Sequence, residues 1–128
     1  MDPNKLLEEL LELSTANSES ASLILFESMQ RAGELFVELD DWFAKGGFTP
    51  ALWKVVSADM MEDSYAKAQI VSNSGRDLLS RTANEFLATD GCCPLRKGLQ
   101  FFRAFLKLHG LIVGGYPLPS IWRGEMPK

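Results

Sequence analysis

Gly46-Gly47-Phe48-Thr49-Pro50-Ala51-Leu52-Trp53-Lys54 is the stretch that decides the fold, because the chain repeats its features once. The second copy, one residue longer, reads Gly114-Gly115-Tyr116-Pro117-Leu118-Pro119-Ser120-Ile121-Trp122-Arg123. In each copy two glycines follow an apolar helical stretch and lead through an aromatic residue and a proline to a tryptophan and a base. A glycine just past a helix adopts the left-handed conformation without a Cβ clash and so ends the helix. The repeat therefore predicts two helical units with matching ends.

The aromatic residue after each glycine pair has a predicted place. If the second glycine of each pair is the left-handed residue, a Schellman motif brings Phe48 against Phe43 and Tyr116 against Leu111. These contacts would fix the direction in which the chain leaves each helix.

Each proline in the repeat suits the first turn of a short helix that carries Trp53 or Trp122. We expect both indoles to fold back over the preceding helix and fill the core, because buried aromatic side chains dominate core energetics. The alternative is that a tryptophan anchors a protein partner, since tryptophan is enriched in interface hot spots. The candidates for that role are Trp42, Trp53 and Trp122.

The rest of the chain has the apolar spacing of helices. A leucine-rich helix over residues 3–15 is followed by a cap-like stretch at 17–20 and a second helix, whose wide apolar face predicts a central position. The segment 58–89 carries a slim row, Ala68, Ser72 and Gly75, and can form one helix or two; we favour one. A last helix spans about 95–113. The sequence thus predicts an all-α fold, a compact bundle of four to five helices in a single domain, 1–128, with a pseudo-repeat at 18–54 and 94–123.

Composition excludes several classes of protein. The 128 residues are 46% hydrophobic and 23% charged, which is typical of a globular domain rather than a disordered chain. No apolar run approaches the roughly 20 residues of a membrane span, and the first residues lack a secretion signal, so we expect a cytoplasmic protein that does not enter a membrane. Cys92 and Cys93 are adjacent and predict reduced thiols, whose reactivity stays open. With His109 as the single histidine, we predict no metal site and no cofactor.

Charge is divided unevenly along the chain. Residues 1–63 carry 13 acidic and 4 basic side chains, a net charge of −9, whereas residues 64–128 carry 9 basic and 4 acidic ones, a net charge of +5. A surface with two such faces favours association with another copy or with charged partners.

A basic ridge is predicted on the last helix, where Arg96, Gln100, Arg103 and Lys107 recur at helical spacing. Such a ridge can follow the phosphates of a nucleic acid. We favour a solvated face, because nucleic-acid readers are usually basic and this chain has a pI near 5.0.

Arg103-Ala104-Phe105-Leu106-Lys107-Leu108-His109 resembles the Arg-x(4-6)-His pair of all-helical ribonucleases of the HEPN class, although Ala104 stands where that family usually has a polar residue. The resemblance implies a catalytic pair, Arg103 and His109. The alternative is that His109 is a packed residue near a helix C-terminus, where the dipole favours it.

The segment from Leu39 to Trp53 resembles a Trp-x-x-x-Gly-Gly-Phe-x-Pro segment of small uncharacterised proteins of bacteriophages and their bacterial hosts. That resemblance implies an intracellular accessory protein that binds a host or phage component, and it implies no activity.

Our sequence-based hypothesis is a non-catalytic helical protein that binds a protein partner or a second copy of itself, with Trp42, Trp53, Trp122, Arg96, Arg103 and Lys107 as interaction candidates. The alternative is a nucleic-acid-directed protein, either an RNA or DNA binder or a HEPN-like ribonuclease. A third hypothesis is an acidic decoy that imitates DNA with the carboxylates of the first half.

Overall fold

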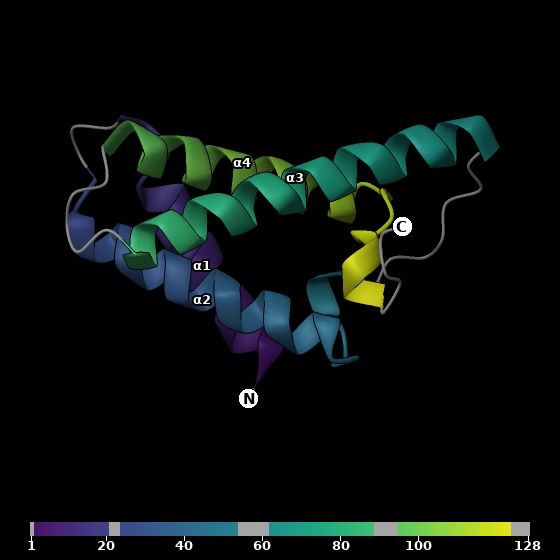
Figure 1. The fold of residues 1–128 in the computed structure, drawn as a ribbon, viewed down its shortest axis with the longest axis horizontal. Coiled ribbons are helices and arrows are strands. Elements are labelled where there is room, and N and C mark those ends of the chain that lie inside the picture. Colours follow the sequence, from purple (N-terminus) through teal and green to yellow (C-terminus); the bar gives the residue numbers. More distant parts are fainter. Residues whose placement is uncertain (1, 21–23, 54–61, 89–94, 124–128) are drawn as a thin grey trace.

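The fold is a bundle of α-helices (Figure 1). The computed structural model describes residues 2–20, 24–53, 62–88 and 95–123, and these contain four α-helices, two short 3-10 helices and no strand, which confirms the predicted all-α class. Their bounds are α1 Pro3–Ala16, α2 Phe26–Ala44, η2 Ala51–Trp53, α3 Glu62–Ala88, α4 Leu95–Val113 and η3 Ser120–Arg123.

Local capping sets the limits of α1. The side chain of Asp2 accepts a hydrogen bond from the backbone N–H of Asn4, and Pro3 occupies the first turn, where its missing N–H costs nothing. At the other end Asn17 closes the helix, because its side-chain Nδ2 donates to the Leu13 carbonyl over 2.7 Å.

The prediction that residues 17–20 cap the second helix is therefore wrong. Asn17 belongs to the end of α1, and α2 begins only at Phe26, with Leu25 in the N-cap position and no side-chain hydrogen bond there. The polar run at 17–20 resembles a start signal because Asn and Ser serve at either end of a helix.

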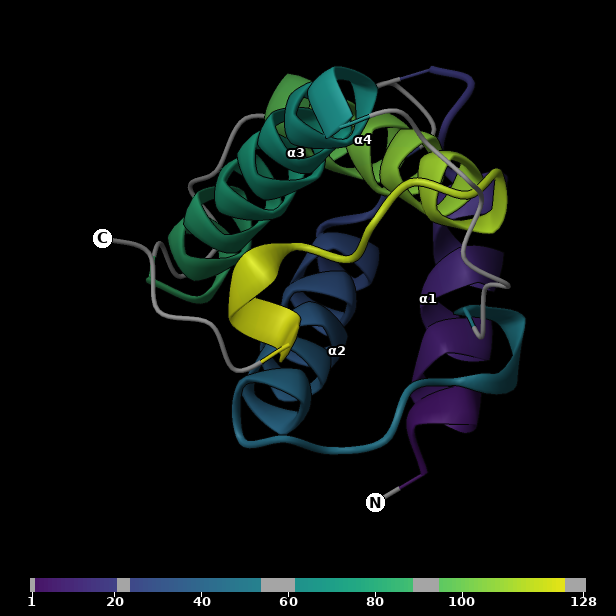
Figure 2. The ribbon, with the colours of Figure 1, turned by 90° about the vertical axis from the view of Figure 1, so that its right-hand side faces the viewer.

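Helix α2 has the central position that its wide apolar face predicts. It packs against α1 on one side and α3 on the other, and η3 lies against its C-terminal half (Figure 2). Two contact faces explain why so much of it is buried: Met29, Ala32, Leu35, Phe36, Leu39 and Phe43.

Helix α3 is continuous, so the segment for which one or two helices were possible forms one. Its slim row faces the bundle: Ala68 and Ser72 are buried, and a Cβ built on Gly75 would lie 3.4 Å from Leu108 of α4. The side chains of residues 64–67, near the start of α3, are exposed, and this end of the helix extends beyond the other helices in Figure 1.

Two sequence-based predictions fall outside the described residues. They concern the cysteines Cys92 and Cys93 and the start of the predicted third helix.

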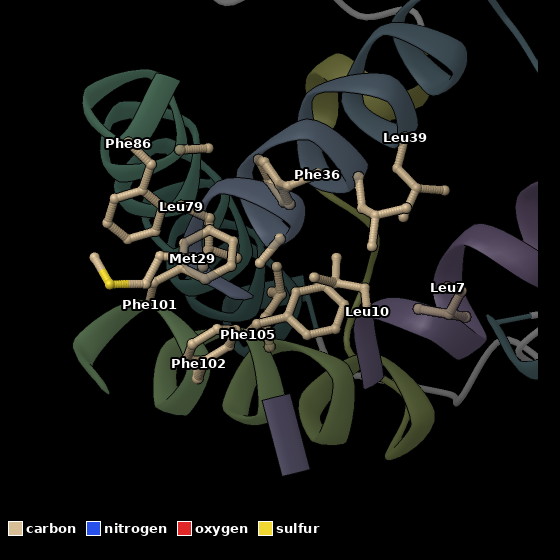
Figure 3. Close-up of a cluster of buried hydrophobic side chains, with 14 of the residues drawn as sticks. Leu7, Leu10, Met29, Phe36, Leu39, Leu79, Phe86, Phe101, Phe102 and Phe105 are labelled. Atoms are coloured by element: carbon tan, nitrogen blue, oxygen red, sulfur yellow. The ribbon is translucent and has the colours of Figure 1, made fainter. Parts of the chain in front are cut away.

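The core is built by side chains from all four α-helices, which point toward one another in Figure 3. Phe101 lies at its centre, with edge-to-face ring contacts to Phe36, Phe86 and Phe102 at centroid distances of 5.4 to 5.9 Å. Aromatic pairs in this arrangement contribute about 0.5–1.5 kcal/mol each beyond the area they bury. The apolar row Phe101, Phe105, Leu108 and Ile112 of α4 therefore faces inward, whereas Val113 at the end of the helix remains 53% exposed.

Both glycine pairs end a helix with the hydrogen bonds of a Schellman motif, but in different registers. In the second turn Gly115 is left-handed, with φ 110°, and the N–H of Tyr116 donates to the Leu111 carbonyl, as predicted. In the first turn the left-handed residue is Gly46, with φ 88°, and the N–H of Gly47 donates to the Trp42 carbonyl.

The shift in the first turn corrects the predicted contact of Phe48 with Phe43. Phe48 packs edge-to-face on Trp42 instead, with ring centroids 5.4 Å apart, and it stays 57% exposed. The Trp42 indole lies over Gly47, where a Cβ would come within 2.3 Å of the ring. Gly47 is therefore required for its small size, and the left-handed position falls on Gly46.

Replacing Gly46 with alanine is expected to lower the free energy of unfolding by about 1 kcal/mol, because an L-residue in the left-handed region is strained. The site has space for the methyl group, so the loss would come from the backbone alone. Gly110 offers a matched control, since its Cβ also meets open space but its backbone is helical. Gly110→Ala is expected to raise stability by about 0.5–1 kcal/mol. Urea unfolding followed by circular dichroism measures both, and two changes of the same sign would contradict this account of the turn.

Candidate functional site

The two tryptophan turns meet in the core. Trp53 and Trp122 are 2% and 4% exposed, and their rings stack with centroids 5.5 Å apart and planes 14° apart. Phe43 lies against both indoles, at 5.8 and 5.0 Å. The structure thus places both tryptophans as core residues, and in this conformation neither offers surface to a partner.

Asparagines from other helices hold the two turns in place. Asn4 of α1 accepts a hydrogen bond from the backbone N–H of Ala51 over 2.7 Å, at the start of η2. Asn73 of α3 accepts one from the N–H of Ser120 over 2.8 Å, at the start of η3. Both side chains act as caps supplied from a distant part of the chain, which local sequence signals cannot reveal.

Asp40 joins three elements through polar contacts, and the sequence did not single it out. Its carboxylate accepts two hydrogen bonds from Arg76 of α3, from Nε over 2.8 Å and from Nη2 over 2.6 Å. It also accepts one from Nε1 of Trp122 over 2.6 Å. Hydrogen bonding to Asp40 raises the pKa of Arg76 above its ordinary value. Asp40 therefore ties α2 to α3 and η3, as a structural junction and not as an open site.

His109 is half-buried and hydrogen-bonded to a core residue. Its Nδ1 accepts a hydrogen bond from Nε1 of Trp53 over 2.8 Å, so the neutral imidazole carries its proton on Nε2. Burial lowers the pKa of His109 below its ordinary value of about 6.5. The geometry supports the packed role that we set against catalysis.

This contact predicts a pH dependence of stability. Because the folded state has the lower His109 pKa, the unfolded state binds the proton more tightly, and stability falls as the pH drops below about 6.5. His109→Gln keeps an acceptor for the Trp53 N–H but does not titrate. Urea midpoints measured between about pH 7.5 and 5.5 should fall more steeply for the wild type than for His109→Gln. Parallel curves would show that His109 titrates normally in the fold.

Arg103, the other member of the predicted pair, binds the backbone of the loop after α1. Its guanidinium donates to the carbonyl of Ser18 over 2.8 Å and to that of Glu19 over 3.1 Å, just after the end of α1. Six residues along a helix correspond to about 9 Å of rise and a turn of roughly 240°. Arg103 and His109 accordingly contact different partners, the 18–19 loop and Trp53, and the ribonuclease alternative gains no support from the geometry.

The basic ridge of α4 lies on the surface, as predicted. Arg96, Gln100, Arg103 and Lys107 are all exposed, while Lys97 beside them forms an ion pair with Glu85 over 2.6 Å. No aromatic side chain of the described α4 residues shares this exposed row, because Phe101, Phe102 and Phe105 are buried. Single-stranded nucleic acids are usually bound with exposed aromatic rings, which this face lacks.

An apolar groove between α3 and α4 is the surface feature that the sequence reasoning missed. This α3–α4 groove has a volume of about 310 Å³, and its lining is mainly aliphatic: Ile70, Val71, Leu78, Ala104, Leu108 and Leu111. Ile70 and Val71 are 65% and 42% exposed, although large aliphatic side chains usually lie inside. The signal in the sequence was the pair Ile70-Val71, two large aliphatic residues beside the slim row of Ala68, Ser72 and Gly75.

Two lysines border the α3–α4 groove. Lys107 is the charged residue among those that line it, and Lys67 is exposed on α3 one turn before Val71, on the same side of the helix. Neither lysine has an ion-pair partner among the described side chains, which leave out those of residues 62 and 63 in the first turn of α3. The groove therefore combines an apolar floor with a positive edge.

Other kinds of site find no support in the described ranges. There, no three His, Cys, Asp or Glu side chains gather in a way that could hold a metal ion. Within the same residues, no helix has both the length and the apolar character needed to cross a membrane. Comparison of the chain with protein-family models, curated proteins and solved structures finds no match.

Proposed function

We propose that the protein is a non-catalytic interaction module, and that its α3–α4 groove binds a helical segment of a protein partner. The observation that carries this proposal is the exposure of Ile70 and Val71 at a groove between α3 and α4. Grooves of this kind receive the apolar side of an amphipathic helix, which inserts side chains at spacings of three and four residues.

The edge of the groove specifies the chemistry of the partner. Lys107 and Lys67 would face the flanks of a bound helix, so carboxylates on those flanks would be attracted and basic residues repelled. The proposed partner is therefore an acidic amphipathic helix with an aliphatic ridge. The resemblance of residues 39–53 to phage and bacterial proteins adds an accessory role in the cell to this proposal.

The proposal is tested by fluorescence anisotropy with two labelled helical peptides of about 18 residues, five helical turns. Both have leucine and alanine on one side; one has glutamate on the other side, and the second has lysine. The glutamate peptide should bind the wild-type protein and the lysine peptide should bind at least about tenfold more weakly, a difference of about 1.4 kcal/mol.

The matched variants are Ile70→Ser/Val71→Ser and Leu25→Ser. Leu25 is 65% exposed, as Ile70 is, but it lies at the start of α2 away from the groove. Binding of the glutamate peptide should weaken at least about tenfold in the double variant, because one aliphatic side chain contributes about 1.5–3 kcal/mol when buried. Binding of this peptide should persist in Leu25→Ser. No binding to the wild type, or equal loss in both variants, would overturn the proposed function.

A further inference from the structure

A second apolar surface lies on α1 and η2, and its edge is acidic. This α1–η2 patch is a shallow hollow of about 450 Å³, lined by Glu8, Leu11, Glu12, Thr15, Ala16 and Leu52. Leu52 is 60% exposed beside the partly buried Leu11, while Glu8 and Glu12 are exposed one turn apart on α1. An exposed leucine on a 3-10 helix thus projects next to two carboxylates.

The α1–η2 patch and the α3–α4 groove are complementary in both respects that matter for docking. Each has exposed aliphatic side chains, Leu52 on one and Ile70 and Val71 on the other. The edge of the first carries Glu8 and Glu12, and the second has Lys107 in its lining and Lys67 one helical turn before Val71. The same asymmetry runs through the chain, with a net charge of −9 in residues 1–63 and +5 in residues 64–128.

The two surfaces cannot meet within one molecule. They belong to different parts of one packed bundle, in which α1 lies below α3 and α4 in Figure 2. Both surfaces are open to solvent, since Leu52, Ile70 and Val71 are exposed. Contact between them needs a second molecule. Because the two surfaces differ, the contact is head-to-tail: after pairing, one molecule keeps a free groove and the other keeps a free patch.

We propose that the α3–α4 groove binds the α1–η2 patch of a second copy of this chain, with Leu52 inserted beside Ile70 and Val71 and with Glu8 and Glu12 facing Lys107. This inference rests on the proposed function and names its partner. The surfaces are small, so the association is weak, with a dissociation constant of roughly 10 µM to 1 mM. It continues beyond the dimer, to closed rings or short chains, because a heterologous contact does not use up both surfaces of a molecule.

The test reverses charges on the two surfaces and follows the weight-average mass by sedimentation. Lys67→Glu/Lys107→Glu makes both surfaces acidic, and Glu8→Lys/Glu12→Lys makes both basic, so each double variant alone should lose self-association by at least about tenfold. An equimolar mixture of the two should associate again, and so should one chain that carries all four changes. Arg96→Glu is the control, since Arg96 is exposed on the same ridge of α4 but outside the groove.

Each outcome has one meaning. Loss in the separate variants, rescue in the mixture and no change in Arg96→Glu support the contact. A strictly monomeric wild type, or loss of mass without rescue in the mixture, overturns it. If the wild type is monomeric but still binds the glutamate peptide in the groove, this inference fails and the proposed function stands.

Discussion

Trp122→Ala is expected to lower the free energy of unfolding by about 3–5 kcal/mol, the range for removing a large buried aromatic side chain. Trp122 is 4% exposed and its ring contacts Phe36, Phe43 and Trp53, so alanine leaves a cavity where the two turns meet. The change also removes the N–H that donates to Asp40, the carboxylate that Arg76 also binds. Urea unfolding followed at 222 nm measures the loss without depending on tryptophan fluorescence.

Two further variants keep this prediction testable if the alanine protein does not fold. Trp122→Phe retains an aromatic ring and loses the N–H. We expect the free energy of unfolding to fall by roughly 1–3 kcal/mol, because Asp40 loses a hydrogen-bond donor and the smaller ring fills less of the core. Leu52→Ala removes a side chain that is 60% exposed on the first turn and should change stability by less than about 0.5 kcal/mol. Equal losses in Trp122→Phe and Leu52→Ala would contradict the placement of Trp122 in the core.

Asp40→Ala is expected to lower the free energy of unfolding by about 3 kcal/mol, because it removes one partner of a largely buried ion pair. Arg76 and Asp40 are 18% and 17% exposed, so the remaining guanidinium would stay poorly solvated, with Asp77 as its surviving carboxylate partner. The N–H of Trp122 would lose its acceptor at the same time. Chemical denaturation of the purified variant gives the value.

The neighbouring residue provides the control for Asp40. Asp41 pairs with Lys45 over 2.8 Å, but both side chains are more than half exposed, and such pairs contribute about 0–1 kcal/mol. Asp41→Ala should therefore have little effect. In a double-mutant cycle, Asp40→Ala should cost less in the presence of Arg76→Leu than in the wild type, since the uncompensated charge is gone. Additive losses would show that Asp40 and Arg76 do not act as a pair.

The sequence predicted the helices well where their apolar spacing repeats over several turns. The row on α2 from Met29 to Phe43 and the one on α4 from Phe101 to Ile112 are both buried. Predictions that depended on single residues did less well. The cap-like run at 17–20 lies at the C-terminal end of α1 and not at the start of α2. In the first turn the left-handed glycine is Gly46, because Trp42 covers Gly47. Each of these outcomes depends on a neighbour that local signals do not contain.

The candidate site was harder to predict than the fold. Lys107 was identified as part of a basic ridge, yet the groove beside it depends on how α3 and α4 are set side by side, which no single helix reveals. Trp53 and Trp122 became core residues once both turns closed on Phe43. The sequence did not single out Asp40, and only the packing of α3 and η3 shows its three hydrogen bonds.

The most direct test of the α3–α4 groove as a docking surface is a methyl NMR spectrum of isoleucine-labelled protein over a dilution series from roughly 1 mM to 10 µM. Ile70 is 65% exposed in the groove, whereas Ile24 and Ile112 are buried and serve as internal references. We predict that the Ile70 signal moves with concentration and with added glutamate peptide, while the signals of Ile24 and Ile112 stay in place. An Ile70 signal that stays fixed through both titrations would contradict the account.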